Sequence, residues 1–219
     1  MTTNQDNKNN QSTDNNNQTT DNNNNAKLLE LIKNLFTHSI QALKSEFGEE
    51  AVEGQVSQHE VYGPLFSFLV KNEQGEAYAC GFFLRELLAN FQQNKNPVLW
   101  LSSFYVDLMK TPGGKLLPKP PQSEDEAKAM MDQVVLPMCH QAIKEEFAPE
   151  EVYTGLDVNK EHGPVLEAGF PKYKDGNNVC AMPLHLLLAH YLLNRDPSDL
   201  IIQGLYRILD EQQNVQPQA

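Results

Sequence analysis

The sequence predicts an α+β fold in which one module occurs twice in tandem. Each copy is expected to hold a helix, a β-hairpin of two or three short strands and two further helices. Three observations lead to this prediction: the chain resembles itself at a constant spacing of 100 residues, both copies share turn and helix-start signals, and a Pro/Gly-rich segment separates them. We expect the copies to pack as a pseudo-twofold body, because each is marginal in size alone.

Residues i and i+100 match without a gap from Gln41 to Met109, with 16 identities in 69 positions. Composition alone would yield roughly 4 to 5 identities over that length. In the numbers of the first copy, the identities fall at Gln41, Ala42, Lys44, Glu46, Phe47, Glu50, Val52, Gly63, Pro64, Cys80, Leu84, Leu87, Leu88, Ala89, Asn94 and Pro97. Many other positions keep their apolar character, so the duplication preserves a packing pattern.

A helix is expected at the start of each copy, because apolar residues recur there at a period of 3.6. The apolar stripe runs from Leu28 to Phe47 in the first copy and from Met131 to Ile143 in the second. Ser123 and Glu126 have the spacing of a capping box that would start the second helix. Pro137 lies inside that helix and predicts a kink or a break.

A β region bounded by turn residues follows in each copy. The expected hairpin strands are Leu65–Val70 and Ala77–Phe83 around residues 72–75, and Val165–Phe170 and Asn178–Met182 around residues 174–177. Gly63 and Gly163, each followed by Pro, are expected to introduce the first of these strands. Val52–Val56 and its equivalent in the second copy are expected to add a short third strand.

Two helices are expected to close each copy. The first has an apolar stripe at i, i+3, i+4 and i+7. The stripe residues are Leu84, Leu87, Leu88 and Phe91, matched by Leu184, Leu187, Leu188 and Tyr191. The pairs Asn96-Pro97 and Asp196-Pro197 each place a capping residue directly before a proline, which predicts a last helix running through Met109 or Leu209.

These elements divide the chain into five segments. Residues 1–25 form an Asn-rich tail that is too polar to offset its ordering entropy, so we expect it to be disordered. The first copy spans residues 26–110 and the second 124–210. A Pro/Gly-rich linker at 111–123 joins them, and residues 211–219 form a polar C-terminal tail. Pro118 and Pro121 make a minimal PxxP pattern, which we interpret as part of the linker.

The protein is acidic, with a formal net charge of −12. Nucleic acid and anionic membrane surfaces are therefore not expected as partners, because both attract clusters of Lys and Arg. No stretch approaches the ~18 apolar residues of a membrane-spanning helix, and the first residues lack the basic and apolar regions of a secretion signal. Three cysteines are too few for a disulfide framework. The cytoplasm is the expected location.

Cysteine is the one reactive residue type that the repeat duplicates, at Cys80 and Cys180. Both residues lie in apolar strands, where a free thiol packs as a small hydrophobe. The alternative is a redox or metal sensor formed by the pair. Neither copy has a second cysteine at CxxC spacing, and no nucleotide, metal or nucleophile motif occurs, so no cofactor and no metal are expected.

None of the six histidines has a histidine at the equivalent position of the other copy. This excludes a duplicated catalytic or metal site that uses histidine, although a site in one copy remains possible. His162 and His185 are the candidates for such a site. Trp100, which matches Leu200, is expected to fill the core or an interface, with a binding anchor as the alternative.

The leading functional hypothesis is a non-enzymatic protein that binds another protein or a small-molecule ligand at the junction of its two copies, as a monomer or homodimer. Its candidate binding residues are Trp100, His162 and His185. No catalytic residue is assigned. The alternative is an enzyme with an asymmetric site at the copy interface that uses a histidine of the second copy.

Overall fold

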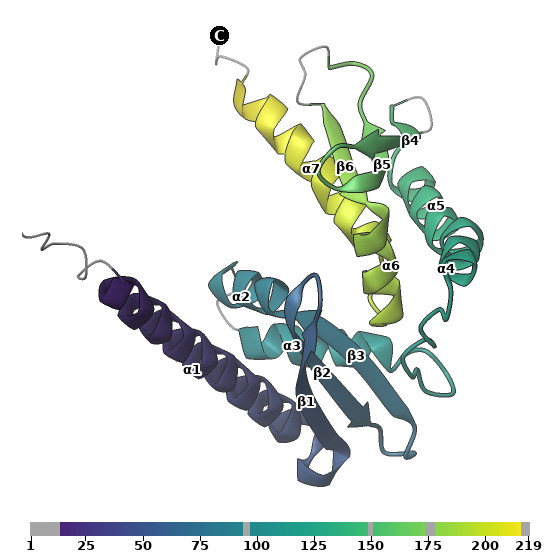
Figure 1. Ribbon diagram of the computed structural model, residues 1–219. Helices are drawn as coiled ribbons and strands as arrows, with labels where there is room; N and C mark the ends of the chain where they lie inside the picture. The colour runs from purple at the N-terminus through teal and green to yellow at the C-terminus, as the bar shows by residue number, and fades with distance from the viewer. Residues whose placement is uncertain (1–13, 94–96, 149–150, 174–177, 216–219) are drawn as a thin grey trace, which may run out of the picture. The chain divides into compact units, whose positions relative to one another are not determined.

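The computed structural model describes residues 14–93, 97–148, 151–173 and 178–215 (Figure 1). Over these residues a helix, a three-stranded sheet and two further helices occur twice in the same order, which confirms the predicted α+β fold with tandem copies. Contacts divide the chain into two compact units. The first unit is Met1–Glu76 with Phe82–Lys110, and the second is Ala77–Gly81 with Thr111–Ala219.

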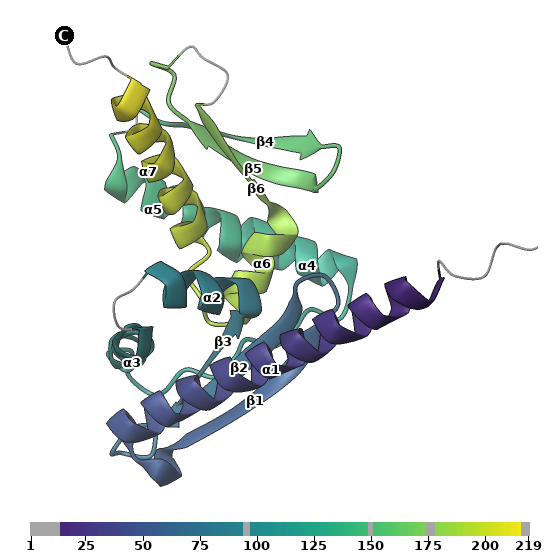
Figure 2. The ribbon, with the colours of Figure 1, turned by 90° about the vertical axis from the view of Figure 1, so that its left-hand side faces the viewer.

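The elements of the first copy run in the predicted order. They are α1 (Asp14–Phe47), a 3-10 turn (Glu49–Ala51), β1 (Val52–His59), β2 (Gly63–Lys71), β3 (Ala77–Phe83), α2 (Leu84–Gln93) and α3 (Pro97–Leu108). The strands form a sheet in the order β1-β2-β3. Figure 2 shows α1 running along β1 and β2, and the two helical side chains of Phe36 and Ile40 lie beside Gly54 of β1.

The second copy repeats this order with a divided first helix. Its elements are α4 (Glu124–Met130), a π-helical turn (Met131–Val135), α5 (Leu136–Glu146), β4 (Tyr153–Asn159), β5 (Gly163–Gly169), β6 (Val179–Pro183), α6 (Leu184–Leu192) and α7 (Ser198–Val215). The sheet order is β4-β5-β6. The third strand that the sequence predicted at Val52 and its equivalent is present in both copies.

Strand register is the same in the two sheets. Val56 pairs with Phe66 in the first, and Leu156 pairs with Leu166 in the second, as the spacing of 100 residues requires. A slip of one residue in either sheet would have turned every apolar side chain to the opposite face. The duplication therefore fixes both which strands pair and which residues are opposite one another.

Burial follows the repeat as closely as the register does. Among the described residues, eleven positions are buried hydrophobics in both copies: Leu35/Val135, Leu43/Ile143, Val52/Val152, Phe66/Leu166, Phe68/Ala168, Val70/Phe170, Cys80/Cys180, Leu87/Leu187, Leu101/Ile201, Tyr105/Leu205 and Leu108/Ile208. Side-chain volume differs at many of these pairs, most at Phe68 and Ala168. Each copy thus fills its own core by a different packing of the same positions.

The predicted helix-start and helix-break signals have clear structural counterparts. Ser123 Oγ accepts a hydrogen bond from the backbone N–H of Glu126 at 3.2 Å, which confirms the cap of α4. The π-helical turn ends at Val135, two residues before Pro137, and the Leu136 N–H donates to the Met131 carbonyl. Proline cannot donate to the carbonyl of Gln133, so the helix is interrupted at the expected place.

The ends of the folded body differ from the predictions. Helix α1 begins at Asp14, so the part of the predicted tail from 14 to 25 is helical, whereas residues 1–13 lie outside the described residues. Extending a helix past its packed region adds one hydrogen bond per residue and requires no new nucleus. Helix α7 likewise continues to Val215, beyond the predicted end of the second copy at 210. Residues 216–219 of the predicted C-terminal tail are not described.

The assignment of Ala77–Gly81 to the second unit rests on backbone hydrogen bonds. Ala79 N–H donates to the Lys115 carbonyl at 2.8 Å, and Gly81 N–H donates to the Leu193 carbonyl at 3.0 Å. Asn194 has a φ of 57° and donates from its side chain to the Ala79 carbonyl. The first residues of the predicted linker are thus paired with this strand segment. Among the described residues, none of the helices has the length and apolar character needed to cross a bilayer.

Candidate functional site

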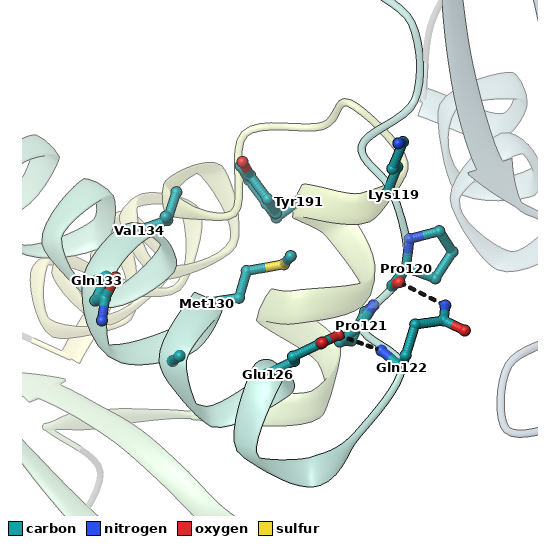
Figure 3. A pocket seen from close by; sticks show the side chains of 10 residues that line it. Lys119, Pro120, Pro121, Gln122, Glu126, Met130, Gln133, Val134 and Tyr191 are labelled. Carbon is teal, nitrogen blue, oxygen red and sulfur yellow. Dashed lines mark hydrogen bonds between the residues drawn. The ribbon is translucent and has the colours of Figure 1, made fainter.

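The second unit carries a groove with a cavity volume of about 640 Å³, which we call the α4 groove (Figure 3). Its lining residues are Lys119, Pro120, Pro121, Gln122, Glu126, Ala129, Met130, Gln133, Val134 and Tyr191. They come from the extended segment before α4, from α4 and the π-helical turn, and from α6. This volume lies within the usual range of about 300–1,000 Å³ for ligand sites.

The wall formed by residues 119–122 has one hydrogen bond to α4 and one within itself. The Gln122 N–H donates to Glu126 Oε2 at 2.7 Å, and the Gln122 side-chain amide donates to the Pro120 carbonyl at 3.0 Å. Pro120 and Pro121 add stiffness because their rings fix φ. The predicted capping box therefore has a second role, since its glutamate holds one side of the groove in place.

Apolar side chains form the interior of the α4 groove. Figure 3 shows Met130 reaching from the last turn of α4 toward the space that Tyr191 and Pro120 flank. Val134 lies in the π-helical turn, one turn further along. Methionine adapts readily to differently shaped apolar partners, and π turns widen a helix at the place where they occur. The groove thus offers an adaptable apolar surface bounded by a stiff wall.

The edge of the groove next to the start of α4 is acidic, while Lys119 is the one cation among the lining residues. Glu124, Asp125 and Glu126 form the first turn of α4, where carboxylates stabilise the positive end of the helix dipole, and all three are exposed. Residues 111–219 contain nine Lys and Arg against sixteen Asp and Glu, a net charge of −7. The electrostatic field around the α4 groove therefore favours a cationic partner.

The first unit has a smaller pocket of about 430 Å³ beside α2, which we call the α2 pocket. It is lined by Tyr62, Pro64, Leu84, Arg85, Leu88, Ala89 and Gln92. At the equivalent positions the second copy has His162, Pro164, Leu184, His185, Leu188, Ala189 and Leu192. Four of these seven pairs are identical, compared with 16 of 69 over the whole repeat, so the second copy repeats the apolar residues that line this pocket.

The two histidines predicted as site residues, His162 and His185, therefore correspond to two residues that line the α2 pocket in the first copy. His162 ends the β4–β5 turn and His185 lies in the first turn of α6, and both side chains are exposed. Their counterparts Tyr62 and Arg85 line one pocket. Sequence reasoning found the positions through unmatched histidines but did not identify the shared pocket, because that requires knowing that the turn lies next to the helix.

The other predicted site residue, Trp100, is partly buried in α3. Its ring packs edge-on against Phe82 with 5.6 Å between ring centroids, and it lies 6.4 Å from the ring of Phe104. Its counterpart Leu200 packs against the core of the second copy. A contribution of Trp100 to packing is thus evident, and its role as a binding anchor stays a prediction.

All three cysteines are buried free thiols. Cys80 Sγ donates to the Leu193 carbonyl at 3.2 Å. Burial raises the pKa of the Cys139 thiol to about 12, with the charge of Asp196 adding to the rise, and burial likewise raises the pKa of Cys180. These environments stabilise the thiol over the reactive thiolate.

Within the described ranges, no group of three or more His, Cys, Asp or Glu side chains is arranged to hold a metal ion. The α4 groove and the α2 pocket are places among the described residues where a ligand can dock. Comparison with known proteins gives no family assignment: the chain matches no protein-family model, no curated protein and no solved structure.

Proposed function

We propose that this protein is a protein-binding module whose α4 groove receives an apolar segment flanked by basic residues. The observation that carries the proposal is a groove with an apolar interior, a stiff proline wall and an acidic helix turn at one edge, all in one compact unit. A small-molecule ligand is the alternative occupant. We favour a peptide because the groove is an open surface channel, whereas small molecules usually bind in sites that bury most of their surface.

The polar groups of the groove support binding in preference to chemistry. Glu126 is held by the Gln122 N–H, and the Gln122 side chain is held by the Pro120 carbonyl. A catalytic acid or base needs to reach a substrate proton. Here Glu126 and Gln122 position the wall, and Met130, Val134 and the ring of Tyr191 supply the apolar contact surface.

Charge selects among apolar partners. The acidic first turn of α4 and the net charge of the second unit repel acidic segments and speed the approach of basic ones. An amphipathic helix with Leu on one face and Lys on the other would place its apolar side chains against Met130 and Val134. Its lysines would then lie at the rim, near Glu124 and Asp125.

The test uses the full chain and two synthetic 14-residue amphipathic peptides, one of Leu and Lys and the other of Leu and Glu. Calorimetric titration should show saturable binding of the Lys peptide and at least about tenfold weaker binding of the Glu peptide. The variant Met130→Asp should weaken binding of the Lys peptide by about tenfold or more, because it places a charge in the apolar interior of the groove.

Met130→Asp also separates groove binding from general electrostatic attraction. It makes the protein more acidic, so non-specific attraction of the Lys peptide would increase. Val61→Asp is the matched control, since Val61 is an exposed apolar residue of the first unit. Binding that survives Met130→Asp, or that fails equally in both variants, would show that the α4 groove is not the site.

A further inference from the structure

The α2 pocket of the first unit has chemistry that the protein-binding proposal does not use. Pro64, Leu84 and Leu88 give it an apolar lining, and Arg85 places a guanidinium at its edge. Arg85 is the only arginine among residues 26–110. Its side chain forms no salt bridge with any carboxylate of the described residues.

The surroundings of Arg85 keep its charge available. The nearest carboxylate in sequence, Glu86, accepts a hydrogen bond from the Phe83 N–H at 2.9 Å and so caps the start of α2. Tyr62, which also lines the pocket, belongs to a cluster of three rings, with its centroid 4.8 Å from Phe83 and 5.0 Å from His59. The pocket thus combines a packed aromatic ring, an exposed cation and apolar lining residues.

We propose that the α2 pocket binds a small organic carboxylate with an apolar body. The guanidinium fork matches a carboxylate through two parallel hydrogen bonds, and the apolar body would lie on Pro64, Leu84 and Leu88. A volume of about 430 Å³ suits a ligand of this size. The overall negative charge of the protein disfavours anions, so recognition depends on this one local cation.

The duplication supports a ligand with two parts. The residues retained in both copies are the apolar ones, Pro64, Leu84, Leu88 and Ala89, which would hold the body of the ligand. The polar positions differ, with Tyr62 and Arg85 replaced by His162 and His185. Imidazole is a weaker counter-charge than guanidinium at neutral pH. The first copy is therefore the carboxylate site, and its equivalent in the second copy has a different polar preference.

The experiment is a titration of the full chain with 4-phenylbutyrate, followed by backbone amide shifts in NMR spectra, with 4-phenylbutanol as the uncharged analogue. The expected result is saturable shifts of amides in α2 and the β1–β2 turn with the carboxylate. Arg85→Gln should weaken binding of 4-phenylbutyrate by about ten- to a hundredfold, as expected for a lost charged hydrogen bond. Its affinity for 4-phenylbutanol should be unchanged. The affinity of Arg85→Lys for 4-phenylbutyrate should lie between those of the unmodified chain and Arg85→Gln.

Lys33→Gln is the matched control, because Lys33 is an exposed cation of the same unit outside the pocket. It should bind 4-phenylbutyrate like the unmodified chain. The inference is overturned if the carboxylate gives no saturable shifts, if the shifts fall outside the α2 pocket, or if Arg85→Gln binds it as well as the unmodified chain. Met130→Asp lies in the other unit and should not change the affinity for 4-phenylbutyrate. Failure of this inference can therefore be distinguished from failure of the α4 groove proposal.

Discussion

Gly204 of α7 and Cys180 of β6 lie so close together that a Cβ atom on Gly204 would overlap the cysteine sulfur. The equivalent residue in the first copy is Phe104, whose ring packs edge-on against Phe82 at 5.3 Å between centroids. The two copies thus use opposite solutions at one helix position, a large ring in one and no side chain in the other. In the second copy, the glycine lets α7 lie directly against Cys180 of β6.

Gly204→Ala should destabilise the protein by about 1–2 kcal/mol, measured by urea unfolding. Alanine ordinarily stabilises a helix interior by about 0.5–1 kcal/mol relative to glycine, but overpacking a core costs about 1–3 kcal/mol. The double variant Gly204→Ala/Cys180→Ala removes the overlapping sulfur and should recover part of the loss. Additive effects of the two substitutions would show that the contact does not limit the packing.

Asn194 is a second position where local geometry controls stability. It is 6% exposed, adopts a φ of 57°, and donates to the carbonyls of Ala79 and Lys115. Asn194→Ala should cost about 2–4 kcal/mol, because it loses both hydrogen bonds and strains the backbone. Asn194→Gly should cost about half as much, since glycine tolerates this φ. Equal losses for both variants would assign the whole effect to the hydrogen bonds.

The buried thiols give a test of the redox or metal sensor hypothesis. Cys80 and Cys139 are fully buried, and Cys180 is 8% exposed. In native protein at pH 8, none should react with Ellman's reagent on the timescale of minutes, whereas all three should react in 6 M guanidinium. Rapid reaction of Cys80 or Cys180 in the folded state would revive the sensor hypothesis.

The raised pKa of Cys139 also has a defined effect on stability. The folded thiol has a pKa of about 12, compared with an ordinary value of 9.0. Between these values the folded state holds the proton that the unfolded state releases, so stability falls as pH rises through this window. Cys139→Ala should lower stability at pH 7 through lost packing and should flatten this part of the pH profile. An unchanged slope above pH 9 would contradict this account.

Much of the fold was predictable because the two copies supply two independent views of one pattern. Phe66 and Leu166 are both fully buried at matched positions of matched strands, although their side chains differ. Apolar character is set by the face of the strand, which repeats with the register. Caps and turns were equally visible, because Ser123 and Gly163 act on residues close to them in sequence.

The candidate site was less predictable because its residues are distant in the chain. Pro121, Met130 and Tyr191 line one groove, yet 61 residues separate the last two. The proline pattern was interpreted as linker, and its position directly before a capping box was the signal that it lies against α4. Sequence periodicity also did not show that Leu156 and Val158 are 61% and 71% exposed, because an apolar residue in a strand can lie outside the packed part of the sheet.

Glu126 links the fold of the second unit to its proposed function, and two substitutions separate these roles. Glu126→Gln keeps an acceptor for the Gln122 N–H but removes a rim charge. It should leave the free energy of unfolding nearly unchanged. It should weaken binding of the Leu/Lys peptide by about two- to fivefold, as for the loss of a surface charge pair.

Glu126→Ala removes the acceptor as well, and the wall at residues 119–122 loses its attachment to α4. This variant should lower the free energy of unfolding in urea by about 1 kcal/mol, as is typical of a lost helix-capping interaction. The loss is no larger because the Gln122 N–H, left without its acceptor, lies at an exposed helix start. Its loss of peptide affinity should exceed that of Glu126→Gln, since a loosened wall must be ordered again upon binding. If both variants bind the peptide equally well, the wall is not part of the binding surface, and the affinity comes from charge and from the apolar face of α4 alone.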